Sequence, residues 1–99
     1  MNMHKMTVLQ AKFLADKADD LFHKAALAWE RGNNSGSCAS LTRGKEQCAK
    51  LRNQAEALLK PLGIIVDYPG LYPSFTVRGF SEHTTLAAIS AALERKVVA

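Results

Sequence analysis

Two apolar stripes of similar length, separated by a segment with almost nothing to bury, constrain this fold more than any other feature. The first stripe advances in alternating steps of four and three residues, the spacing of a seam along one helix. Its members are Leu14, Ala18, Leu21, Ala25 and Ala28, flanked by Phe13, Phe22 and Trp29. We therefore predict a first helix over residues 7–31, stopped by Gly32, because glycine tolerates the left-handed conformation after a helix end.

The second stripe keeps a heptad rhythm, with Gly44 at the one seam position that lacks an apolar side chain. Its members are Leu41, Cys48, Leu51, Ala55, Leu58 and Leu62. This pattern predicts a second helix over residues 40–60, because Pro61 disfavours continuation. The linker over residues 32–39 is rich in Gly, Asn and Ser, so we expect a flexible connection and two antiparallel helices. In that arrangement Gly44 would leave room for the ring of Trp29.

The pattern changes after residue 63. Residues 63–68 (GIIVDY) are β-branched and apolar, and residues 74–80 (SFTVRGF) alternate, so a β-hairpin is predicted over residues 63–80. We expect one face of the hairpin to be buried against the helices, since two strands alone are marginally stable. The expected buried residues are Ile64, Val66, Phe75 and Val77.

A third helix is predicted over residues 82–96, with Ser81 as its cap. Its apolar stripe is Leu86, Ile89, Leu93 and Val97. The fold class is therefore α+β, in which an antiparallel helical hairpin is followed by a β-hairpin and a C-terminal helix (α-α-β-β-α). Ninety-nine residues suit a single domain over residues 1–99.

The composition indicates a cytoplasmic protein. No stretch approaches the apolar length of a membrane span, and the N-terminal segment does not have the features of a signal peptide. The two cysteines, Cys38 and Cys48, match no disulfide framework and no zinc signature. A redox pair or half of a metal site is the functional alternative, and we favour one loop thiol and one core thiol.

The sequence offers no catalytic constellation, so we predict a protein that is not an enzyme and uses no cofactor or metal. His4, His23 and His83 do not lie at metal-ligand spacing with one another or with a cysteine. Ser81 beside His83 suggests a nucleophile and a base, but helix capping accounts for this serine.

Basic residues outnumber acidic ones on the second helix. They include Arg43, Lys45, Lys50 and Arg52. Such a surface could follow a phosphate backbone or contact an acidic partner, and the alternative is an ordinary solvated helix surface. The protein's net charge of +4 does not decide between them.

Residues 68–73, which we call the aromatic–proline loop, are the strongest candidate for a binding site. The loop contains Tyr68, Pro69, Leu71, Tyr72 and Pro73, where polar turn residues are usual. Tyrosine is enriched at interface hot spots, so the loop is a candidate anchor for a partner. The alternative is that these side chains fold back and complete a small core.

Two segments, CAKLRNQAEALLKPLG and IIVDYPGLYPSFTVRGF, together with the α-α-β-β-α order, resemble the phage anti-RecBCD protein 2 family. This resemblance covers most of the chain and contains no catalytic motif. It implies a lambdoid phage accessory protein that binds the host RecBCD helicase-nuclease through the RecC subunit, so that phage recombination can use the DNA ends. It also implies association with a host peptidyl-prolyl isomerase. Pro69 and Pro73 lie in an aromatic–proline context, so either could be the target, and Pro69 is our first choice. The alternative function is a small basic nucleic-acid-binding protein.

Overall fold

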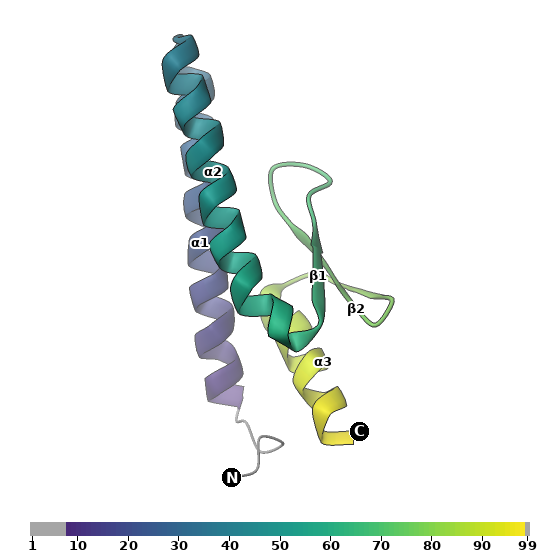
Figure 1. The fold of residues 1–99 in the computed structure, drawn as a ribbon. Helices are drawn as coiled ribbons and strands as arrows, with labels where there is room; N and C mark the ends of the chain where they lie inside the picture. Colours follow the sequence, from purple (N-terminus) through teal and green to yellow (C-terminus); the bar gives the residue numbers. More distant parts are fainter. Residues whose placement is uncertain (1–7, 99) are drawn as a thin grey trace.

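A computed structural model of the chain describes the backbone of residues 8–98 and the side chains through residue 93. The elements in chain order are α1 (Val8–Asn34), α2 (Cys38–Leu59), the short 3-10 helix η2 (Lys60–Leu62), β1 (Ile64–Asp67), β2 (Ser74–Val77), β3 (Phe80–Glu82) and α3 (Thr85–Val98). Figure 1 shows the helical hairpin of α1 and α2 extending beyond the sheet and α3. The α+β class and the leading helical hairpin are confirmed. Residue 7, where the first helix was expected to begin, lies outside the described residues.

Small side chains bring α1 and α2 together. The buried residues of α1 are Ala11, Ala15, Ala18, Phe22, Ala25, Ala26 and Gly32, and those of α2 are Gly44, Cys48, Ala55 and Leu59. The predicted stripe on α1 is only partly correct, because Leu14, Leu21 and Ala28 are half-buried. Ala11, Ala15 and Ala26, which lie outside the predicted stripe, are buried as well, because α1 packs against α3 as well as α2.

Gly32 does not end α1, contrary to the sequence-based expectation. The helix continues to Asn34, and Gly32 is buried against α2 at the position of Gly44. A Cβ atom on Gly44 would lie 2.7 Å from the carbonyl oxygen of Ala28 and 2.9 Å from the Cα of Gly32. The space beside Gly44 is thus filled by the backbone of α1, and the expectation that it holds the ring of Trp29 is wrong.

The connection between α1 and α2 is shorter than predicted. Only residues 35–37 lie outside the two helices, and Gly36 adopts a φ of +74°. The backbone N–H of Ser40 donates to Oγ of Ser37 at 3.0 Å, which caps α2. Residues 38 and 39, expected in the linker, therefore belong to the first turn of α2.

The described residues form a three-stranded antiparallel sheet in the order β1-β2-β3. Its inner face carries the predicted residues: Ile64, Phe75 and Val77 are buried, and Val66 packs against the same core. Phe22 of α1 meets the ring of Phe75 edge-on, with 5.9 Å between ring centres. This ring contact joins the sheet to α1, and the strands also pack against α3 and α2.

The third strand, β3, was not predicted, and it displaces the start of the last helix. Ser81 pairs with Thr76 inside the sheet, so it does not cap α3. The cap is Thr84, whose Oγ1 accepts a hydrogen bond from the backbone N–H of Ala87 at 3.1 Å. Consequently α3 begins at Thr85 and not at residue 82.

The stripe of α3 is also shifted from its predicted position. Ile89 is fully buried, as predicted, but Leu86 is exposed, and Thr85 takes the inward position. The hydroxyl of Thr85 donates to the carbonyl oxygen of Ala15 at 3.3 Å, which satisfies this buried polar group. The side chain of Val97 lies outside the described residues. Among the described helices, none has the length and apolar character needed to cross a membrane.

We predict that Gly44→Ala destabilises the protein despite the better helix propensity of alanine. The propensity gain is about 1 kcal/mol, whereas forcing a methyl group into a packed contact costs about 1–3 kcal/mol. Here the contacted atoms are backbone, which cannot move aside easily. Urea denaturation should show a lower midpoint for Gly44→Ala.

The matched control is Gly70→Ala, because a Cβ there meets no atom within 4 Å and the backbone φ is not positive. Its midpoint should stay close to that of the parent. An unchanged or higher midpoint for Gly44→Ala would contradict the close approach of α1 and α2.

Candidate functional site

The aromatic–proline loop joins β1 to β2, and Tyr68 at its start is folded onto the helices. The Tyr68 hydroxyl donates to Oε2 of Glu56 on α2 at 2.8 Å. The Tyr68 ring also meets Phe22 edge-on, with 6.4 Å between ring centres. This tyrosine therefore completes the core, as the alternative interpretation of the loop predicted.

Arg52 is the second attachment of the loop to α2. Its guanidinium carbon lies 4.1 Å from the centre of the Tyr68 ring, and its Nη2 donates to the carbonyl oxygen of Leu71 at 3.1 Å. Arg52 and Glu56 are four residues apart, so they share one face of α2. Arg52, predicted as part of a basic partner-binding surface, is thus committed to an internal contact.

The environment of Tyr68 favours its neutral form. Burial raises the pKa of the Tyr68 phenol, and the hydrogen bond to the Glu56 carboxylate raises that pKa further. The positive charge of Arg52 acts in the opposite direction and is the weaker influence. Tyr68 is therefore a structural hydrogen-bond donor at neutral pH.

The middle of the loop faces solvent. Pro69, Gly70 and Tyr72 are exposed, with 61% of Tyr72 accessible, while Leu71 and Pro73 are half-buried. None of the described peptide bonds is cis, so both Tyr-Pro bonds are trans. The loop thus combines two attached residues, Tyr68 and Leu71, with two residues that a partner can reach, Pro69 and Tyr72.

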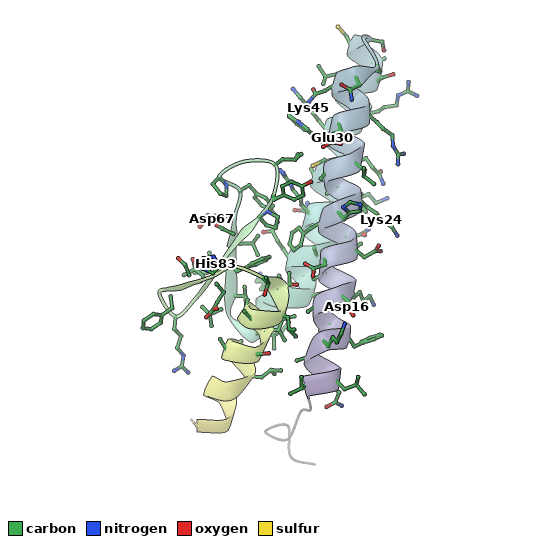
Figure 2. The ribbon with its side chains drawn as sticks, turned by 180° about the vertical axis from the view of Figure 1, so that it is seen from behind. Asp16, Lys24, Glu30, Lys45, Asp67 and His83 are labelled. Atoms are coloured by element: carbon green, nitrogen blue, oxygen red, sulfur yellow. The ribbon has the colours of Figure 1, made fainter. Side chains whose placement is uncertain are left out.

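The other predicted site residues lie along α2, with Arg43 and Lys45 near its start and Lys50 near its middle. Arg43, Lys45 and Lys50 are exposed, and Nζ of Lys45 lies 5.6 Å from the centre of the Trp29 ring. Figure 2 shows Lys45 and Glu30 towards the free end of the helical hairpin, whereas Asp67 and His83 lie beside the sheet. The structure therefore brings Arg52 into contact with the aromatic–proline loop, while Arg43, Lys45 and Lys50 are exposed on the same helix.

A hollow near the free end of the hairpin adds a cation that sequence reasoning missed. Arg31 from α1 and Arg43 from α2 line a space of about 280 Å³ together with Ser35 and Ser40. We call these four residues the basic hollow. Arg31 was overlooked because only the charges of the second helix were considered, and the antiparallel pairing of α1 and α2 brings it beside Arg43.

The candidates for other chemistry lie apart from one another. Cys38 is exposed and Cys48 is buried, and neither forms a disulfide. His23 and His83 are both exposed. Within the described part of the chain, no group of three or more His, Cys, Asp or Glu residues could hold a metal ion.

Comparisons with family models, with curated proteins and with solved structures found no match to this chain.

We predict that Tyr68→Phe lowers stability by about 1–2 kcal/mol at neutral pH, since it removes one hydrogen bond to a charged acceptor. The parent should also lose stability above about pH 10, where an unfolded tyrosine ionises while folded Tyr68 keeps its proton. Tyr68→Phe lacks this group, so its stability should fall less at alkaline pH. Urea denaturation at pH 7 and at alkaline pH measures both effects.

Tyr72→Phe is the matched control, because the Tyr72 side chain is mostly exposed. Its stability should follow that of the parent at every pH. If Tyr68→Phe behaved in the same way as Tyr72→Phe, the internal role of the Tyr68 hydroxyl would be wrong.

Proposed function

We propose that this chain is a non-enzymatic, protein-binding modulator of the host RecBCD helicase-nuclease, which it contacts through RecC in the host cytoplasm. The consequence would be protection of phage DNA ends and their use in recombination. The named partner comes from the resemblance of residues 48–80 to the phage anti-RecBCD protein 2 family. The observation that supports a binding role is the attached aromatic–proline loop, which presents Pro69 and Tyr72 to solvent.

Attachment of the loop supports a binding role for energetic reasons. Ordering a mobile loop on association costs free energy, and a loop already held in one conformation avoids much of that cost. Here the Tyr68–Glu56 hydrogen bond and the Arg52–Leu71 hydrogen bond hold the loop before any partner arrives. Tyr72 is then available as an aromatic anchor of the type enriched at hot spots.

The two prolines differ in their exposure to solvent, and this difference favours one of them as the contact for the host peptidyl-prolyl isomerase. Pro69 is exposed next to Gly70, whereas Pro73 is half-buried at the start of β2. An isomerase has to enclose the proline and its neighbours, so accessibility favours Pro69. We therefore propose Pro69 as the isomerase contact and Tyr72 as the anchor beside it.

We predict that Tyr72→Ala weakens retention of purified RecBCD on the immobilised protein by about tenfold or more at physiological salt. Its thermal midpoint should stay near that of the parent, because the side chain is mostly exposed. Phe13→Ala is the matched control, since Phe13 is exposed to 68% on α1, and it should retain RecBCD fully. Failure of the parent to retain RecBCD would refute the specific form of the proposal.

The basic hollow favours a second candidate function, nucleic-acid binding. Two arginines and two serines are among the residues that line one space, and arginine suits phosphate oxygens because its donors form a planar fork. Among the described residues, the ion pairs are Lys12–Asp16 and Lys24–Asp20, so Arg31 and Arg43 are not neutralised by a carboxylate. A nucleic-acid backbone would then lie across the free end of the helical hairpin.

For this second function, we predict that the parent shifts single- or double-stranded DNA in a gel at low salt and loses the shift steeply as salt rises. The double variant Arg31→Ala and Arg43→Ala should abolish the shift, and Lys12→Ala with Lys17→Ala should preserve it with the same change in net charge. Absence of any shift with the parent at low salt would eliminate this function.

A further inference from the structure

The turn between β2 and β3 has an unfavourable residue at its first position. Val77 pairs directly with Phe80, so the turn consists of Arg78 and Gly79 alone. Both have positive φ, +51° and +84°, as a type I′ turn requires. Asparagine, aspartate and glycine are preferred at its first position, while other L-residues are strained there by about 1–2 kcal/mol.

The strain at Arg78 is not explained by an internal contact. The Arg78 side chain is exposed, and among the described residues it forms neither an ion pair nor a side-chain hydrogen bond. Arg78 is also the one described non-glycine residue with positive φ. Strained backbone conformations of this kind cluster at functional sites, so the strain at Arg78 points to a contact outside the folded chain.

A second unusual residue lies at the other end of this turn. Phe80 is 65% exposed although it belongs to a strand, and Arg78 precedes it by two residues. A two-residue turn fixes the backbone between them, so the guanidinium and the phenyl group are presented together at low entropic cost. Arginine and aromatic side chains are the residue types that dominate binding energy at protein interfaces.

The local charge favours a protein partner over a nucleic acid. From Ile64 to Thr84 the chain carries one Arg or Lys, Arg78, against the carboxylates Asp67 and Glu82. Binding along a phosphate backbone depends on several cations acting together, which this region does not offer. An aromatic ring beside a single guanidinium matches an apolar pocket with a carboxylate at its rim.

We propose that the β2–β3 turn is a second contact point for the protein partner, in which Phe80 enters an apolar pocket and Arg78 pairs with a carboxylate beside it. This inference rests on the proposed function, because it assigns a further contact to the same partner. The strain at Arg78 then lowers the folding stability, and the arginine is kept at this position because it contributes to binding.

The variant Arg78→Asn distinguishes an effect on folding stability from an effect on binding. It places asparagine before Gly79, the residue pair that type I′ turns prefer. Arg78→Asn should raise the thermal midpoint by about 4 °C or more. It should also weaken binding to purified RecBCD by about tenfold or more. A purely structural arginine would not produce opposite changes in the two measurements.

Phe80→Ala should weaken binding to a similar extent. Phe13→Ala and Lys17→Asn are the matched controls, with an equally exposed ring and the same loss of charge elsewhere, and both should bind as the parent does. If Arg78→Asn and Phe80→Ala bind as tightly as the parent, this inference is overturned while the proposed function stands. If the parent itself does not bind RecBCD, both are overturned.

Discussion

The structure depends on the close approach of α1 and α2 at Gly32 and Gly44. With the Cα of Gly32 2.9 Å from a Cβ built on Gly44, neither helix can carry a larger residue there without moving the other. Further along the pair, alanines on α1 and Cys48 and Ala55 on α2 maintain the close packing. Two helices in such contact form a stiff support, because packed interiors have little free volume and transmit displacement.

That close packing determines where the rest of the chain can lie. Because the seam with α2 uses small side chains, the large ring of Phe22 is available to the sheet and meets both Phe75 and Tyr68. The aromatic–proline loop is therefore positioned from two directions, by Phe22 on α1 and by Arg52 and Glu56 on α2. A displacement of one helix against the other would move these supports apart and release the loop.

The sequence predicted the helical hairpin and the inner face of the sheet, because heptad spacing and strand alternation are local patterns. It failed where a residue's role depended on a distant neighbour. Gly32 looks like a helix stop by itself, and only its contact with Gly44 explains a buried position within α1. The turn at Arg78 lacked the usual Asn-Gly signal, so β3 was missed and Ser81 was taken as a cap.

The same limit applies to the candidate site. Sequence reasoning identified the aromatic–proline loop but left two interpretations open, and both describe part of it: Tyr68 is internal and Tyr72 is exposed. It also grouped Arg52 with the exposed cations of α2, because charge alone does not distinguish a residue that reaches Leu71 from one that reaches solvent. The deciding contacts join residues that are 12 positions apart, Glu56 and Tyr68, and 19 positions apart, Arg52 and Leu71. Helical periodicity carries no information on such pairs.

The positions of the two proposed contacts constrain the shape of a single partner. The aromatic–proline loop precedes β2 and the Arg78 turn follows it, so a strand of four residues, about 13 Å long, separates them. The helices pack on the inner face of the sheet, and Ile65, Thr76 and Ser81 share the opposite face through their pairing. Ile65 is exposed on that outer face. Phe80 pairs with Val77, whose side chain lies on the inner face, so the Phe80 ring projects on the inner side of the sheet while remaining exposed. A partner that binds both Phe80 and Tyr72 therefore has to reach the side of the sheet on which the helices pack, and the exposed outer face with Ile65 is not its centre.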